Sequence, residues 1–186
     1  MLVNLNGWPA AGKLTVGRLL AAQLGARLVT NHAILDLAEA VADRGTSRFY
    51  EAVRSIRTTT FHLLAQLPED TPVVLTNVIV RGGSRFPEEN WSAILELARI
   101  RRCGLYSVTL QCEPSELAKR IVSEDRAAFR KIRDAAVLAT AVAERTLFDD
   151  GATQRTTIDN TRLSPEVCAA QIAIWLSSFR RPSADL

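Results

Sequence analysis

The fold is decided by the stretch Val3-Asn4-Leu5-Asn6-Gly7-Trp8-Pro9-Ala10-Ala11-Gly12-Lys13-Leu14-Thr15. An apolar run ends at Gly7, and the apolar residues after Lys13 have the spacing of one face of a helix. Glycine, four residues and then Gly-Lys at a strand-to-helix turn is typical of a loop that wraps phosphate groups. In such a loop, backbone N–H groups and the positive end of the helix dipole form an anion site. The stretch therefore predicts a nucleotide-binding site.

One position of this loop departs from the usual pattern. The residue after Lys13 is Leu14, where the motif has serine or threonine, and the hydroxyl group arrives one residue later, at Thr15. We still expect the whole loop to contact the phosphates of the nucleotide. The expected phosphate-binding residues are Gly7, Pro9, Ala10, Ala11, Gly12, Lys13, Leu14 and Thr15.

Length and composition are those of one globular domain. The chain has 186 residues, of which 47% are hydrophobic and 23% charged, so neither disorder nor membrane insertion is indicated. No apolar run has the length of a membrane span. The predicted first strand begins at Leu2, which leaves no room for a signal peptide. We expect a cytoplasmic protein without a membrane partner.

The charge and the cysteines argue against a nucleic-acid partner and against a framework of disulfides or metal ligands. The net charge is +3, and lysines are few among the 23 basic residues. Arginines that face the phosphates of a nucleotide explain this mild excess, so a nucleic-acid partner is not expected. Cys103, Cys112 and Cys168 are odd in number and lack metal-ligand spacing. We therefore expect buried thiols, with neither a disulfide framework nor a metal cluster.

Strand-like and helix-like segments alternate along the chain. We expect four more strands at 26–30, 73–78, 105–110 and 156–158, and helices that include 34–45, 48–67 and an Ala-rich one ending near Phe148. This alternation predicts an α/β fold with three layers, α/β/α, around a five-stranded, mainly parallel sheet. Ligands of such sheets bind beyond the carboxyl ends of the strands. The segments expected to converge there are 7–13, 30–32, 76–85 (with a loop at 81–85), 111–113 and 159–161.

The phosphate loop resembles that of the small P-loop kinases, which include shikimate kinase, gluconate kinase, chloramphenicol phosphotransferase and the nucleoside monophosphate kinases. It is most similar to a shikimate-kinase-like or AAA-type branch, in which a Gly-Lys-Leu-Thr loop is followed by an Asn-His pair, here Asn31-His32. Residues 110–120 and 158–166 also resemble later parts of that fold. The resemblance implies one P-loop NTPase domain over residues 1–180, with a helical lid at about 120–134 and a frayed tail at 181–186.

The resemblance also implies roles for single residues on the nucleotide side. Lys13 would contact the β- and γ-phosphates, and Thr15 would lie near the α-phosphate. Arg120 would lie beside the adenine ring, together with Asp159 and Asn160. Arg126, in the lid, would neutralise charge on the transferred phosphoryl group as a catalytic residue. If the lid is offset, Arg130 or Lys131 would take the role of Arg126. The alternative is that Arg120 and Arg126 form ordinary ion pairs on a helix surface.

On the acceptor side, the resemblance implies contacts near the ends of the second and third strands. The candidates are Asn31, His32, Asp36, Arg54, Arg57 and Arg81. Asn31 and His32 have the chemistry to orient a hydroxyl group, with neutral His32 as a base; alternatively, one of them caps the next helix. For Asp36, Arg54 and Arg57 the alternative is a solvated helix face.

Such kinases use Mg²⁺ to bridge the phosphates of ATP, and Leu14 offers no ligand for this ion. Candidate contacts are Thr15, through a water molecule, and Thr76 and Asn77 at the end of the third strand. Weak metal binding with slow catalysis is the alternative.

We therefore expect an ATP-dependent phosphotransferase that moves the γ-phosphoryl group to a small hydroxyl-bearing acceptor, as a monomer or weak homodimer. The alternatives are a nucleotide-binding module or slow NTPase without an acceptor, and a kinase for nucleic-acid ends, to which the mild basic charge gives little support. No motif identifies the acceptor, so sugar acids, shikimate-like acids, nucleosides and antibiotics are all compatible with the sequence.

Overall fold

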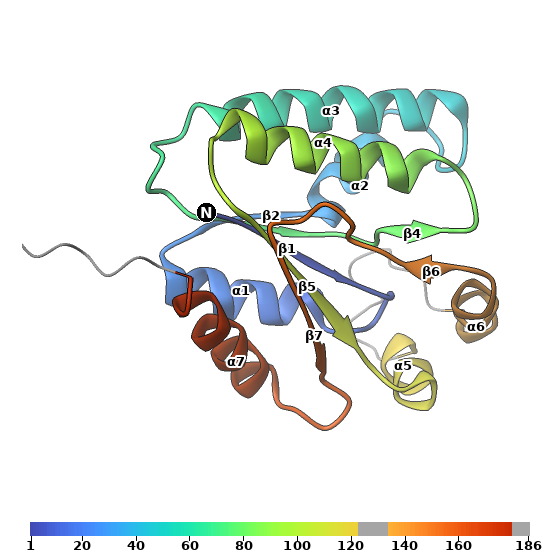
Figure 1. The fold of residues 1–186 in the computed structure, drawn as a ribbon. Coiled ribbons are helices and arrows are strands. Elements are labelled where there is room, and N and C mark those ends of the chain that lie inside the picture. Colours follow the sequence, from blue (N-terminus) through green and yellow to red (C-terminus); the bar gives the residue numbers. More distant parts are fainter. Residues whose placement is uncertain (123–133, 180–186) are drawn as a thin grey trace, which may run out of the picture.

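The central sheet has five strands in the order β2-β3-β1-β5-β7, and every neighbouring pair is parallel (Figure 1). The computed structural model describes residues 1–122 and 134–179. The strands of the sheet are β1 (Leu2–Gly7), β2 (Arg27–Thr30), β3 (Val73–Thr76), β5 (Leu105–Gln111) and β7 (Gln154–Asp159). The predicted five-stranded parallel sheet is therefore confirmed.

Helices cover both faces of this sheet (Figure 1). On one face lie α1 (Lys13–Leu24) and α7 (Pro165–Ser177), and on the other α3 (Ser47–Ala65) and α4 (Phe86–Ile100), with α2 (Asn31–Glu39) beside α3. Short helices α5 (Pro114–Ile121) and α6 (Ala135–Glu144) lie near the carboxyl ends of the strands. The three predicted layers are present.

Strand β1 contributes to the core on both faces, because successive side chains of a strand point to opposite sides. Val3 and Leu5 pack in one core cluster with α1 and α7, whereas Leu2 packs in a second cluster with α4. Every residue of β1 is buried. Leu2, Val3 and Leu5 are therefore apolar on both faces of the strand, as expected for a central parallel strand, and Asn4 and Asn6 are buried polar residues among them.

Two segments differ from the expectation. The Ala-rich helix ends at Glu144 rather than near Phe148, because Thr146–Leu147 forms strand β6. This strand pairs antiparallel with β4 (Val80–Arg81), so Arg81 lies in a strand and not in a loop. Helix α2 also ends at Glu39, earlier than predicted. A ladder of two residues per strand has no periodicity that a sequence pattern could reveal.

Other expectations concern the thiols, membrane spans and the lid. Cys112 and Cys168 are buried, Cys103 is partly buried, and all three are free, as predicted. In the described ranges 1–122 and 134–179, no helix combines the length and the apolar character needed to cross a membrane. Most of the expected lid, including Arg126, Arg130 and Lys131, lies outside the described residues, as does the tail.

The end of α4 is tied to the segment that leads into β3 by Arg101, a residue that the sequence did not single out. Its side chain is buried, and the guanidinium donates to the carbonyl oxygens of Leu64, Pro68 (3.2 Å) and Thr71 (2.8 Å). A charged donor thus satisfies backbone carbonyl groups of the last turn of α3 and of the loop that follows it.

We expect Arg101→Ala to lower the free energy of unfolding by about 2–3 kcal/mol, because buried carbonyl oxygens lose a charged donor. Urea denaturation measures this change. Arg99→Ala is the matched control, since Arg99 lies on the same helix with a side chain that is 74% exposed, and it should leave the free energy of unfolding nearly unchanged. Equal effects of the two substitutions would contradict the anchoring role of Arg101.

Candidate functional site

The phosphate loop connects β1 to α1 through an unusual backbone conformation. Gly7, Ala10 and Gly12 have positive φ angles of 149°, 71° and 83°. A Cβ atom on Gly7 would approach the carbonyl oxygen of Leu110 to 2.8 Å, so only glycine fits there. Gly12 occupies the N-cap position of α1 without a side-chain cap. The start of this helix therefore has the arrangement that binds anions.

Lys13 lies folded over this loop. Its ammonium group donates to the carbonyl oxygens of Gly7 (2.6 Å) and Trp8 (2.8 Å). These bonds hold a positive charge against the same turn whose N–H groups would face a bound anion. The predicted partner of the nucleotide phosphates thus lies at the loop itself.

Asn6 fixes the beginning of the loop, a role that no pattern in the sequence indicated. Its amide oxygen accepts from the N–H groups of Gly7 (2.9 Å) and Ile79 (2.8 Å). Its amide nitrogen donates to the carbonyl oxygens of Ile79 (3.3 Å) and Phe148 (3.1 Å). This buried side chain therefore joins the loop to Ile79, which directly precedes β4, and to Phe148, which directly follows β6.

The residues predicted on the adenine side lie together at the other end of the loop. The amide of Asn160 donates to the carbonyl oxygen of Ala11 at 2.8 Å. Arg120 donates to the carbonyl oxygens of Asn160 (3.2 Å) and Thr161 (3.0 Å), and it also pairs with Glu116 at 2.9 Å. Arg120 is therefore both an ion-pair partner and an anchor of the loop after β7.

Asp159 shapes that same loop. Its carboxylate accepts from the hydroxyl (2.6 Å) and the N–H group (2.9 Å) of Thr161, and these bonds lower the pKa of Asp159. Ionised Asp159 thus stabilises the turn that follows β7.

The predicted acceptor-side pair begins α2. Thr30, and neither Asn31 nor His32, caps this helix, because its hydroxyl oxygen accepts from the N–H group of Ala33 at 3.2 Å. The capping alternative is therefore wrong for the side chains of Asn31 and His32. The N–H group of Asn31 donates to the hydroxyl of Thr76 at 3.4 Å, which places the pair beside the end of β3. Asp36 is exposed one turn further along α2.

A chain of buried amides runs from β1 to α3. Asn77 donates to the amide oxygen of Asn4 (2.8 Å) and accepts from Asn90 (3.0 Å). Arg57 donates to Asn90 at 3.4 Å, and burial lowers the pKa of Arg57. Both ends of the Asn77 amide are therefore engaged within the protein, and Arg57 is a core residue rather than part of a solvated face.

Arg54 and Arg81 form surface ion pairs. Arg54 pairs with Glu89 at 2.9 Å, so the solvated-face alternative describes this residue. Arg81 pairs with Asp150 at 2.8 Å, and its guanidinium lies 4.1 Å from the ring centre of Phe148. Arg81 therefore braces the β4–β6 ribbon.

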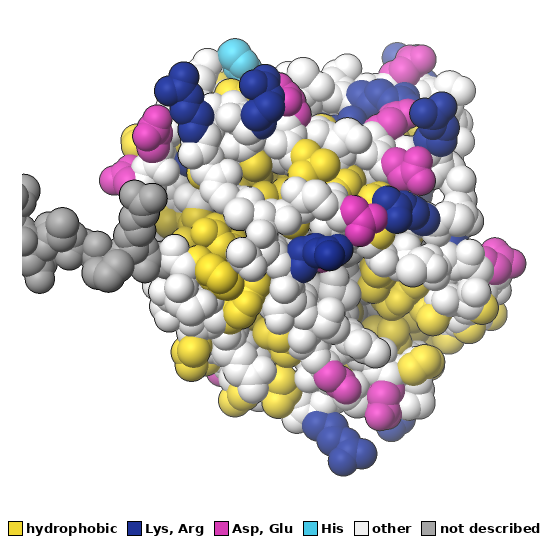
Figure 2. Space-filling view, viewed as in Figure 1, with side chains coloured by type: hydrophobic (Ala, Val, Ile, Leu, Met, Phe, Trp, Pro, Cys, Tyr) yellow, Lys and Arg dark blue, Asp and Glu magenta, His cyan; other side chains and the backbone are white. Residues whose placement is uncertain are grey.

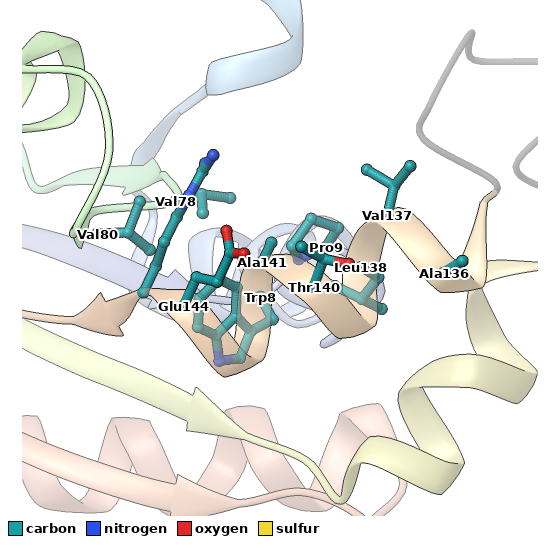
Figure 3. Close-up of a pocket in the computed structure, with 11 residues that line it drawn as sticks. Trp8, Pro9, Val78, Val80, Ala136, Val137, Leu138, Thr140, Ala141 and Glu144 are labelled. Atoms are coloured by element: carbon teal, nitrogen blue, oxygen red, sulfur yellow. The ribbon is translucent and has the colours of Figure 1, made fainter.

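The phosphate loop also borders a pocket of about 490 Å³ that the sequence analysis missed. Hydrophobic side chains gather over α6 and the hollow beside it (Figure 2). Figure 3 shows the pocket between Trp8 and Pro9 of the loop, Val78 and Val80 near β4, and the inward face of α6. The available signal was the segment 135–143, which is the most apolar of the chain.

The side chains fit a magnesium ion only in a limited way. Within the described ranges, no group of three or more His, Cys, Asp or Glu residues is arranged to hold a metal. The hydroxyl groups of Thr15 and Thr76 could offer only neutral oxygen ligands to the ion. The Asn77 amide already has hydrogen bonds to Asn4 and Asn90. This set suits an ion held mostly by phosphate oxygens and water.

The sequence itself matches no protein-family model and no curated protein, but solved structures match over nearly the whole chain. A provisionally named kinase from Chloroflexus aurantiacus has a TM-score of 0.70 at 17% identity, with 96% of this chain and 97% of that one covered. Shikimate kinase from Acinetobacter baumannii, in complex with shikimate, has a TM-score of 0.56 at 19% identity, covering 97% and 95%.

A third match has a bound nucleotide analogue. It is the APS kinase of Mycobacterium tuberculosis in complex with AMPPNP and APS, with a TM-score of 0.60, 15% identity and coverage of 95% and 96%. At these identities the likeness establishes the architecture. The chain has the fold of the small P-loop kinases, as the resemblance implied.

Proposed function

We propose that the protein transfers the γ-phosphoryl group of ATP to a hydroxyl group of a small molecule. One observation carries this proposal: different parts of the molecule border the two ends of the phosphate loop. Asn160 contacts its helical end from β7, and a pocket borders Trp8 and Pro9 at its beginning. A module that only binds a nucleotide needs no pocket beside its phosphate loop other than the nucleotide site itself. A kinase must also hold its acceptor next to that loop.

The loop residues would then divide the phosphate contacts among them. The N–H groups at the start of α1 and the ammonium group of Lys13 would neutralise the β- and γ-phosphates. When bound, Mg²⁺ supplies further neutralisation of the phosphate charge. Thr15 and Thr76 would hold that ion through water, and Asn77 would position the end of β3 through its bonds to Asn4 and Asn90.

Asn31 and His32 are the groups proposed to orient the acceptor hydroxyl, because they follow β2 directly and lie beside Thr76. Neutral His32 has the chemistry of a general base. Asp36 and Arg57 stay candidates on the same side of the sheet. Arg126 stays a prediction from the sequence as the group that neutralises the moving phosphoryl group.

A slow NTPase without an acceptor is the second candidate. The scarcity of side-chain ligands for Mg²⁺ favours it. Leu14 replaces the usual hydroxyl, and Asn77 stands with both ends of its amide engaged where many P-loop proteins have an acid. An ADP-release assay separates the two functions. Acceptor-dependent release above a no-acceptor control supports the kinase, and release that no small hydroxyl compound increases supports the NTPase.

We expect Lys13→Ala to abolish recognition of the γ-phosphate, because the variant loses the charge over the loop. At a hundredfold excess over Kd, ATP stabilises a protein that binds it by about 2.7 kcal/mol. This stabilisation, measured by thermal unfolding with and without Mg²⁺, should disappear in the variant. Lys119→Ala is the control, since that side chain is 78% exposed on α5. Wild-type ATP stabilisation and turnover in Lys13→Ala would rule out the loop assignment.

We expect Leu14→Ser to raise Mg²⁺-dependent ADP release about tenfold, which corresponds to a barrier lower by ~1.4 kcal/mol. The physical reason is the hydroxyl ligand that serine restores beside the phosphates. Leu14→Ala separates this ligand effect from the loss of side-chain volume. If serine and alanine give the same rate at every Mg²⁺ concentration, another residue already supplies the metal contact.

A further inference from the structure

We propose that the acceptor is an amphipathic alcohol with an apolar, ring-sized body, and not a polyhydroxylated sugar acid or cyclitol. This inference deepens the proposed function and rests on it. It assigns the pocket between the phosphate loop, β4 and α6 to the body of the acceptor (Figure 3).

The position of the pocket supports this assignment. Trp8 lines the pocket, and its carbonyl oxygen accepts from the ammonium group of Lys13 at 2.8 Å. A molecule in contact with Trp8 would therefore lie next to the group that holds the terminal phosphates. Val78 and Val80 of the pocket lining follow β3, while Asn160, which contacts the other end of the loop, follows β7 at the edge of the sheet. The nucleotide base and the pocket occupant would thus occupy different ends of the loop.

The chemistry of the wall sets the class of occupant. Trp8, Pro9, Val78, Val80, Val137 and Leu138 present apolar surface to the cavity. A hydroxyl group turned against such a wall loses its hydrogen bonds to water without replacement, which weakens binding by about tenfold or more for each group. A ring or alkyl body gains from the same wall by leaving water. The wall therefore selects against acceptors that carry hydroxyl groups all around.

The size of the cavity limits the occupant further. About 490 Å³ lies within the range of pockets that hold small ligands. This volume is suited to one or two rings with substituents, and it does not accommodate the end of a nucleic acid or a protein segment as a whole.

The charged groups of the pocket lining lie at one rim, and Thr140 adds a single hydroxyl group to the wall formed by α6. Glu144 and Arg145, at the end of α6, provide one acceptor and one donor there. The guanidinium of Arg145 lies against Gly83, where a Cβ atom would come within 3.3 Å of its Cζ atom. A Cβ atom on Gly82 would come within 2.7 Å of the carbonyl oxygen of Glu144. Close packing on these glycines thus fixes the rim, which suits an acceptor with a single polar group at the end remote from its hydroxyl.

The first test uses a binding probe and a matched pair of variants. The probe is 1-anilinonaphthalene-8-sulfonate, a fluorescent ring system with one anionic group. Val137→Asp places a charge in the pocket, and Val167→Asp places the same charge on α7 as the control. Both valines are the third residue of a helix, both donate an N–H group to an N-cap side chain, and their exposed fractions are 53% and 47%.

We expect the dye to bind Val137→Asp at least tenfold more weakly than the wild type, with Val167→Asp unchanged. An acid in the first turn is favourable for a helix, so both variants should fold, and circular dichroism checks this. Equal dye affinity of Val137→Asp and the wild type would overturn the assignment of the pocket.

The second test is ADP release with two matched sets of compounds of similar size. One set contains phenyl, indole and fused-ring alcohols with at most one charged group, and the other contains gluconate, shikimate and myo-inositol. We expect stimulation by members of the first set, reduced at least tenfold by Val137→Asp and retained in Val167→Asp. Stimulation by the second set alone overturns the acceptor class but leaves the kinase function standing. Stimulation by neither set, with Lys13-dependent ATP binding intact, overturns the kinase function and the acceptor class with it.

Discussion

The structure depends on one constraint: the phosphate loop must be held firmly while its helical end stays able to bind an anion. The side chains that hold its turns do so largely through carbonyl oxygens. Lys13 contacts those of Gly7 and Trp8, and Asn160 contacts that of Ala11. Asn6 fixes the point where the loop leaves β1. The positive φ angles of the loop are thus supported from three separate parts of the chain.

The buried amide chain shows how the same region handles charge. Arg57 donates to the neutral amide of Asn90, and Asn77 in turn joins Asn90 to Asn4 on β1. Glu89 lies on the exposed side of α4, where the hydrogen bond from Arg54 holds its pKa below the usual range. The hydrogen bond of Arg57 thus goes to a neutral amide, while its charge interacts electrostatically with the Glu89 carboxylate.

How much of this molecule the sequence predicts depends on the range of the interactions involved. The phosphate loop and the central strands were predictable, because glycine spacing and apolar periodicity are local signals. Asn6 was not, since its bond to Phe148 joins residues 142 positions apart. The β4–β6 ribbon and the burial of Arg57 also arise from tertiary packing alone. The pocket was predictable only in part: its Ala-rich wall is a local pattern in the sequence, but its position beside Trp8 arises from tertiary packing.

The strand order has a consequence for how the chain folds as it is synthesised. β1 leaves the ribosome before the other strands, yet its partners in the sheet are β3 and β5, and β7 completes that side. Until residues 73–76 and 105–111 have emerged, the apolar side chains of β1 have no sheet to enter. Such long-range parallel pairing forms slowly and leaves strand edges exposed to aggregation. The strand that carries the phosphate loop is therefore the one most in need of protection in the nascent chain.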